Sequence, residues 1–197
     1  MIRRGFDLLA AGVGLVLLSP LLLLIGAAIR LDSPGPALFR QLRVGRWERP
    51  FVILKFRTMV VDGVARGGLL TVPDDPRVTR VGRWLRASKL DELPQLINVL
   101  RGDMALVGPR PEVPRYVACY DERQRRVLSV RPGITDPASI RFRNENALLA
   151  GAADPEATYL HEVLPAKLEM NLAYLERRSL ASDVGVILRT LARLVGA

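Results

Sequence analysis

Two adjacent carboxylates, Asp91 and Glu92, open the segment of this chain that is best equipped for chemistry. They precede Leu93-Pro94 and an apolar run that is typical of a helix. Asp is a favoured N-cap residue, and a proline in the first helical turn loses no needed hydrogen bond. One interpretation is therefore an ordinary helix start, with the helix running over about residues 91–101.

The second interpretation of the same pair is a site that handles phosphate. Basic residues stand on both sides of it in the sequence: Arg83, Arg86, Lys89, Arg101 and Arg110. A helix N-terminus offers free N–H groups to a phosphate, and Mg²⁺ typically combines one or two carboxylates with phosphate oxygens. A carboxylate can also attack phosphorus and form an acyl phosphate. The residues alone leave both interpretations open.

The turn Gly108-Pro109-Arg110-Pro111 is the second candidate. Because a proline on either side restricts the backbone, the Arg110 guanidinium has little freedom to lose and suits bidentate phosphate binding. A rigid surface turn with a solvated arginine is the alternative. Other basic candidates, each of which also fits a solvated loop, are Arg57, Arg131 and Arg141.

The composition limits the partners and the cofactors. The net charge of +9 over 197 residues calls for an anionic partner, which is nucleic acid, anionic lipid or a phosphorylated substrate. Nucleic acid fits least, because only 6% of the residues are aromatic and no nucleic-acid-binding motif is present. One cysteine, Cys119, excludes an intramolecular disulfide. With one histidine, His161, a His/Cys metal site is also excluded, so any metal must be a hard cation held by carboxylates.

The elements that must position these residues predict an α+β, mainly helical fold. Two short strands, 37–42 and 51–56, form a small β-hairpin around the polar turn 43–50. Residues 62–77 are rich in Gly, Pro and Asp and predict a loop, and 81–87 form a short basic, apolar segment. Helices are predicted over about 91–101, 114–130, 155–178 and 182–194. The last is amphipathic and basic, which suits a membrane interface or the cover of a protein core.

An uncharged hydrophobic segment from Leu8 to Ile29 indicates membrane attachment. Its length would let a straight helix span a bilayer. Two features favour instead a re-entrant helix broken at Ser19-Pro20: proline removes a backbone donor, and both flanks are basic, which places both ends on the cytoplasmic side. The Ser19 hydroxyl would partly satisfy the carbonyls that Pro20 frees. A spanning anchor and a cleaved signal peptide remain the alternatives.

Taken in order, these motifs resemble the bacterial sugar transferase family, the monotopic polyprenyl-phosphate phosphoglycosyl transferases, in its short form. The resemblance covers nearly the whole chain. It is carried by the hydrophobic segment broken at Ser19-Pro20, LKFRTM (54–59), DDPRVTRVGRWLR (74–86), KLDELPQLINVLRGDMALVGPRPE (89–112), VRPGIT (130–135) and YLERRSLASDVGVILRT (174–190).

The resemblance implies transfer of a sugar-1-phosphate from a UDP-sugar to undecaprenyl phosphate with Mg²⁺ and release of UMP. This is the first membrane step of bacterial glycan assembly, in exopolysaccharide, O-antigen or glycoprotein pathways. Asp91 would form the covalent phosphosugar intermediate, and Glu92 would bind metal or handle the proton. The implied substrate-binding residues are Arg57, Arg86, Pro109, Arg110, Pro111, Arg131 and Arg141. Residues 1–36 would be the re-entrant membrane helix, and 37–197 the catalytic domain on the cytoplasmic face of the inner membrane.

One segment departs from the family pattern. After RPGIT the chain continues with residues 136–145, DPASIRFRNE, where many members have a Gln-containing stretch that ends in Gly-Arg. This puts the recognition of the sugar in doubt rather than the chemistry. Two other hypotheses are a membrane scaffold that kept the fold without the reaction and a glycosyltransferase that releases UDP. Both the Asp-Glu pair and the Pro-Arg-Pro turn are intact, which argues against the scaffold.

Overall fold

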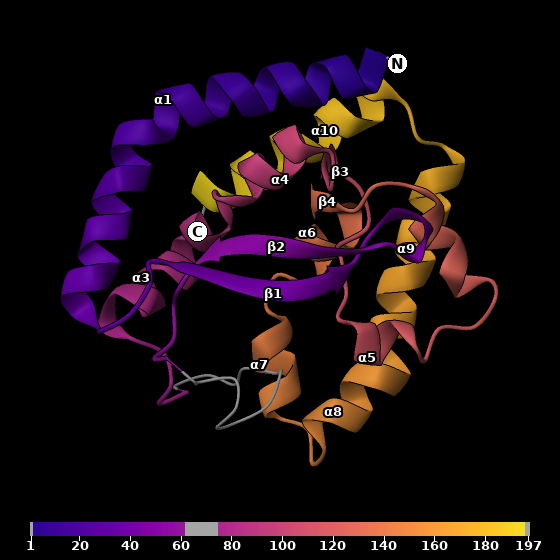
Figure 1. Ribbon diagram of the computed structural model, residues 1–197. Helices are drawn as coiled ribbons and strands as arrows, with labels where there is room; N and C mark the ends of the chain where they lie inside the picture. The colour runs from indigo at the N-terminus through magenta and orange to yellow at the C-terminus, as the bar shows by residue number, and fades with distance from the viewer. Residues whose placement is uncertain (1, 62–74, 196–197) are drawn as a thin grey trace.

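The computed structural model describes residues 2–61 and 75–195, and these form a mainly helical α+β fold with two small sheets, as predicted (Figure 1). The strands are β1 (Leu38–Val44), β2 (Pro50–Phe56), β3 (Ala105–Val107) and β4 (Gly133–Thr135). The α-helices are α1 (Ile2–Asp32), α3 (Arg80–Ser88), α4 (Gln95–Arg101), α5 (Pro114–Val117), α6 (Pro137–Arg141), α7 (Glu145–Ala150), α8 (Pro155–Thr158), α9 (Leu164–Glu176) and α10 (Leu180–Val195). Short 3₁₀ turns η1 (Arg46–Glu48), η2 (Leu90–Glu92) and η3 (Gln124–Ser129) and a π-helical turn η4 (Tyr159–Val163) join them.

Helix α1 is long and apolar enough to cross a membrane by length and composition. It runs continuously through Pro20, and Figure 1 shows that it bends strongly between its two halves. Pro20 cannot donate to the carbonyl of Val16, four residues earlier, and the Ser19 hydroxyl donates to that carbonyl at 2.8 Å instead. The predicted compensation by Ser19 is therefore confirmed, within a bent helix rather than an interrupted one.

Both ends of α1 are attached to the same folded domain. Near its start, Asp7 accepts the backbone N–H of Leu106 at 3.2 Å, and Arg3 donates to a carbonyl just beyond α9 at 2.5 Å. At its other end, Asp32 accepts the N–H of Val81 at 3.0 Å. Between these contacts α1 presents leucines outward, with Leu9, Leu17, Leu23 and Leu24 each about 70% exposed or more. The helix therefore lies along the domain with an apolar face turned away from it.

The predicted hairpin is confirmed. Strands β1 and β2 pair antiparallel from Leu38 opposite Phe56 to Val44 opposite Pro50. Phe56 packs with Ile25, Ile29 and Leu85, so the end of the hairpin helps to anchor α1. The second sheet, in which β3 and β4 pair in parallel, was not predicted.

The helix predicted over 114–130 is wrong in its middle. Only α5 and the turn η3 form, separated by an unwound stretch. Asp121 accepts the N–H of Gln124 at 2.7 Å, and the Gln124 side chain accepts the N–H of Asp121 at 3.1 Å. This reciprocal capping starts a new turn. The helices predicted over 155–178 and 182–194 are found as α8 through α9 and as α10, whereas most of the predicted loop 62–77 lies outside the described residues.

Candidate active site

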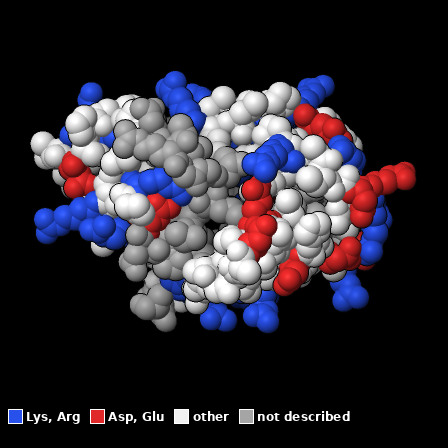
Figure 2. All heavy atoms as spheres, turned by 90° about the horizontal axis from the view of Figure 1, so that it is seen from below, with Lys and Arg blue, Asp and Glu red and all other residues white. Residues whose placement is uncertain are grey.

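A large cleft of about 1870 Å³ lies among α1, the hairpin, η2 and the helices after β4. Asp91, Glu92 and Arg110 all line this cleft. The two carboxylates lie on η2, and Arg110 lies in the turn that follows β3. Basic side chains project around much of the molecular outline when the molecule is seen from below (Figure 2). The cleft is thus embedded in a basic molecule, as an anionic substrate requires.

Asp91 lies in the 3₁₀ turn η2 between α3 and α4 and does not cap a helix. The left-handed residue Lys89 (φ 58°) ends α3, and the N-cap of α4 is Pro94. The helix-cap interpretation of Asp91 is therefore wrong. Its side chain is buried and lines the cleft, and its Oδ1 has no hydrogen-bond partner within residues 2–61 and 75–195. Burial, and then the charge of Glu92, raise the pKa of Asp91.

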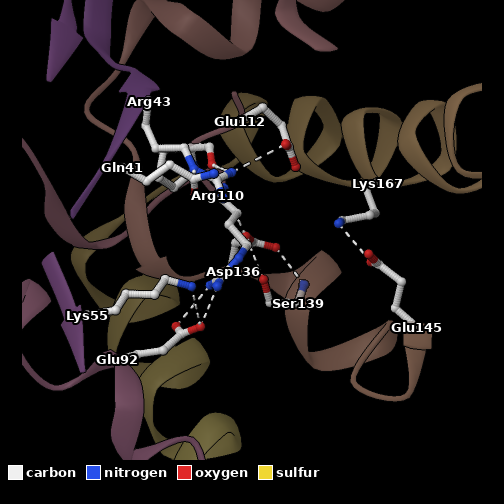
Figure 3. A network of polar contacts seen from close by, with 11 residues as sticks. Gln41, Arg43, Lys55, Glu92, Arg110, Glu112, Asp136, Ser139, Glu145 and Lys167 are labelled. Atoms are coloured by element: carbon white, nitrogen blue, oxygen red, sulfur yellow. Dashed lines mark hydrogen bonds and ion pairs between the residues drawn. The ribbon is translucent and has the colours of Figure 1, made fainter. Parts of the chain in front are cut away.

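Glu92 is held by two cations from different parts of the chain (Figure 3). Its carboxylate accepts Lys55 Nζ at 3.2 Å and Arg110 Nη1 at 2.9 Å, and Arg110 Nη2 also contacts it. Burial alone would raise the pKa of Glu92, but the charges of Arg110 and Lys55 outweigh it and keep the pKa below its usual value. The two neighbouring carboxylates therefore differ: Glu92 is ionised and engaged, and Asp91 has a free oxygen.

The Pro-Arg-Pro turn is fixed through its backbone. The Pro109 carbonyl accepts the N–H of Gly133 at 3.0 Å, and the Pro111 carbonyl accepts Arg43 Nη1 at 2.9 Å. At Gly133 a Cβ would lie 2.1 Å from the backbone nitrogen of Gly108, so this close approach of β4 requires glycine. The predicted rigidity of the turn thus comes from tertiary contacts as well as from its prolines.

Asp136 ties the divergent segment to this turn. It is fully buried, accepts the N–H of Arg110 at 3.0 Å through Oδ2, and caps α6 by accepting the N–H of Ser139 at 2.7 Å through Oδ1. Burial raises its pKa. The segment 136–145 therefore begins beside the predicted site.

Two other predicted arginines line the cleft. Arg86 lies with its Nη1 3.4 Å from Thr58 Oγ1; burial lowers its pKa, and the charge of Asp91 opposes that effect. Arg57 is buried and donates to the carbonyls of Pro34 at 2.5 Å and Ser33 at 2.8 Å, just beyond α1. Arg57 therefore holds the chain that leaves α1, and its contact with substrate stays a prediction.

Four of the predicted substrate-binding residues do not line the cleft: Pro109 and Pro111, on either side of Arg110, and two arginines. Arg131 donates from Nε to the carbonyl of Gly102 at 2.8 Å, at the end of α4. Arg141 is exposed on α6, while its neighbour Arg143 lines the cleft. The proposed roles of Arg131 and Arg141 in substrate binding stay predictions, without support from their positions.

The family of the chain follows from comparison with known proteins. The model of the bacterial sugar transferase family matches residues 1–197. The chain belongs to this family. Among its relatives is a UDP-glucose:undecaprenyl-phosphate glucose-1-phosphate transferase of Caulobacter vibrioides, 41% identical over 98% of this chain and 69% of the relative.

Other relatives are longer than this chain. A UDP-N-acetylgalactosamine-undecaprenyl-phosphate N-acetylgalactosaminephosphotransferase of Aeromonas hydrophila is 39% identical over 98% of this chain, which covers 44% of that protein. A UDP-glucose:undecaprenyl-phosphate glucose-1-phosphate transferase of Escherichia coli is 36% identical over 96% of this chain and 39% of its own length. This sugar transferase thus matches less than half of each of these two relatives, and the relatives' names specify different sugars.

The donor set for a metal ion in this sugar transferase is small. Within the described residues no group of three or more His, Cys, Asp or Glu side chains is arranged to hold a metal. The buried, unpartnered Oδ1 of Asp91 is the free donor beside Glu92. One free carboxylate oxygen fits Mg²⁺ if phosphate oxygens and water supply most of the other ligands, which is the usual arrangement for this ion.

Two residues of the site were missed as site residues in the sequence. Lys55 lies in LKFRTM, a motif that contributed only to the family resemblance, and it contacts Glu92 from β2. Asp136 opens the segment that departs from the family pattern, so resemblance gave no signal for it. The Asp-Pro pair at 136–137 is a helix-start pattern, and that local signal would have placed Asp136 at the N-cap of α6.

Proposed function

We propose that this chain is a phosphoglycosyl transferase that moves a sugar-1-phosphate from a UDP-sugar to undecaprenyl phosphate and releases UMP. The single observation that carries the proposal is the buried carboxylate of Asp91, with one unpartnered oxygen, in a cleft that Lys55, Arg86 and Arg110 also line. The relatives' names support the choice of donor and acceptor.

The reaction proceeds in two displacements. Asp91 attacks the β-phosphorus of the UDP-sugar; the new carboxylate–phosphorus bond forms as the bond to the bridging oxygen breaks, and UMP departs with that oxygen. A phosphate oxygen of undecaprenyl phosphate then attacks the same phosphorus, breaks the acyl phosphate bond and regenerates the Asp91 carboxylate. The products are UMP and a polyprenyl diphosphate sugar, so each step conserves atoms and charge.

The surrounding side chains lower the cost of bringing anions together. Arg110 and Lys55 fix Glu92, and Arg86 adds positive charge on the Asp91 side of the cleft. Asp91, together with Glu92, would hold Mg²⁺, which neutralises charge on the pyrophosphate when bound. The raised pKa of Asp91 makes its ionised carboxylate a better nucleophile than an exposed one.

We also infer that α1 is re-entrant, with the active site on the cytoplasmic face of the inner membrane. Charged side chains at both ends of α1, Asp7 and Asp32, bond to the same domain, and the helix, which contains Pro20, bends between its two halves. The exposed Leu188 and Leu191 of α10, with Arg189 between them, suit the membrane interface. Cysteine labelling from both sides of the membrane tests the topology, and periplasmic access to the N-terminus would contradict it.

The experiment that tests the reaction follows UMP after a UDP-sugar, undecaprenyl phosphate and Mg²⁺ are mixed with the detergent-solubilised chain. We expect UMP with the wild type and none above background with Asp91→Asn. Release of UDP instead would identify a glycosyltransferase. Normal turnover by Asp91→Asn would refute the nucleophile, and absence of nucleotide release with every UDP-sugar would favour a scaffold.

A further inference from the structure

The cleft has a second polar region beyond Arg110, built on β1, α7 and the η4–α9 segment (Figure 3). Tyr159 donates its hydroxyl to Glu112 at 2.6 Å, and Arg43 lies 3.5 Å from the same carboxylate. Lys167 pairs with Glu145 at 2.8 Å. All five side chains line the cleft, and none is a residue of the proposed transfer step. We refer to this region as the balanced end.

The balanced end is costly to build for stability alone. Lys167 is 8% exposed and Glu112 is 9% exposed, and burying such charges costs free energy even when they are paired. Lys167 Nζ also lies 5.2 Å from the ring centroid of Tyr159, a cation–π contact. Tyr159 begins a π-helical turn, a distortion that is frequent at functional sites. The Tyr116 hydroxyl nearby is buried and has no hydrogen-bond partner within the described residues.

Charge separates the two parts of the cleft. Four cations, Lys55, Arg86, Lys89 and Arg110, line it around the two carboxylates Asp91 and Glu92, which suits a pyrophosphate. At the balanced end the cations Arg43 and Lys167 are each paired with a carboxylate, Glu112 and Glu145, and Arg143 also lines the cleft.

Donor groups that lie beside acceptor groups suit a neutral ligand with many hydroxyl groups, because each hydroxyl both donates and accepts. The rings of Tyr116, Phe142 and Tyr159 also line the cleft and offer apolar surface to the C–H face of a sugar.

We propose that the balanced end binds the hexose of the nucleotide sugar and that the Lys167–Glu145 pair reads the pattern of its hydroxyl groups. This inference rests on the proposed function, since the hexose is attached to the phosphate that Asp91 attacks. The turn at Arg110 joins the two regions: its side chain contacts Glu92, and its neighbour Pro111 accepts a hydrogen bond from Arg43. Glu145 lies in the segment that departs from the family pattern, where differences in sugar choice are expected.

The test compares Lys167→Met and Glu145→Gln with the wild-type chain in detergent. The matched control is Glu169→Gln, also on α9, whose carboxylate pairs on the surface with Arg123. The kcat/KM for UDP-glucose and for UDP-N-acetylgalactosamine and the inhibition constant of UMP, which lacks the hexose, are measured for each. We expect the kcat/KM ratio of the two sugars to change about tenfold or more in both variants, with UMP inhibition within about twofold of the wild type and the control unaffected.

Two results would overturn the inference. An unchanged ratio of the two sugars would make the pair structural, and UMP inhibition weakened in parallel would assign the balanced end to the nucleoside. If Lys167→Met lowers the unfolding temperature, Lys167→Arg, which keeps the ion pair, replaces it in the kinetic comparison. If the wild type released no UMP with any donor, the proposed function would fail; equilibrium binding of the UDP-sugars and UMP to the same variants would still decide which group the balanced end binds.

Discussion

The interaction between Glu92 and its two cations, Lys55 and Arg110, predicts a measurable coupling free energy between Glu92 and Arg110. The perturbation is a double-mutant cycle of Glu92→Gln and Arg110→Met. In Glu92→Gln, Lys55 and Arg110 remain close together without the carboxylate between them. In Arg110→Met, Glu92 keeps Lys55 at 3.2 Å. The first change is therefore expected to destabilise the chain more than the second.

The magnitude follows from burial. The side chains of Lys55, Glu92 and Arg110 are 18%, 15% and 27% exposed, so the charges are largely withdrawn from water. Removing one partner of a buried ion pair typically costs about 3–5 kcal/mol. Because the amide oxygen introduced by Glu92→Gln still accepts one hydrogen bond, we expect about 3 kcal/mol for this change and about 2 kcal/mol for Arg110→Met. The double variant should lose about 3 kcal/mol rather than the sum, which is a coupling of about 2 kcal/mol.

The assay is urea unfolding of the four proteins in the same detergent, followed by tryptophan fluorescence. The control is the exposed pair Arg125 and Glu48, whose side chains are 38% and 54% exposed and whose coupling should be below about 1 kcal/mol. Losses for the two single variants that simply add in the double variant would refute the reasoning, as would a Glu92→Gln protein as stable as the wild type.

Three further predictions concern the site and its support. Asp91 must be ionised to attack, so kcat should fall on acidification with a midpoint above the usual Asp pKa of about 3.9. Because the charge of Glu92 raises the pKa of Asp91, Glu92→Gln should move this midpoint to lower pH, and an unmoved pH profile would contradict the prediction. Gly133→Ala places a Cβ 2.1 Å from the Gly108 nitrogen and should lower kcat/KM at least about tenfold through the displaced Arg110; wild-type kinetics would exclude the clash. Arg57→Lys should cost about 1–2 kcal/mol in urea unfolding, because it disrupts the two bonds from the guanidinium to the carbonyls of Ser33 and Pro34; wild-type stability would contradict this.

The sequence predicted the parts of the fold that local patterns determine. The hairpin follows from alternating apolar residues, the last helix from its amphipathic pattern, and the bend in α1 from the backbone donor that Pro20 lacks. Neighbouring residues determine each of these features. The parallel pairing of β3 and β4 was missed because each strand has three residues, too few for a periodic pattern. Their close approach depends on glycine at Gly133, which no local pattern reveals.

The candidate site was predicted unevenly for a similar reason. Asp91, Glu92 and Arg110 are brought to one cleft as predicted. The capping role of Asp91 is wrong because a 3₁₀ turn over Leu90–Glu92 precedes α4, whose N-cap is Pro94. Motif membership alone did not distinguish cleft arginines from structural ones: Arg131 donates to a backbone carbonyl at the end of α4. Such partners depend on tertiary contacts, which a single sequence does not specify.

The central claim, that Asp91 is a covalent nucleophile, is tested most directly by omitting the acceptor. The chain is mixed with a UDP-sugar and Mg²⁺ without undecaprenyl phosphate, UMP is quantified, and the protein is digested for mass spectrometry. We expect a burst of about one UMP per active site, and a phosphosugar on the peptide that carries Asp91, which the lipid phosphate then removes. A phosphosugar on another residue, or full turnover by the wild type with no adduct under any quench, would contradict the claim.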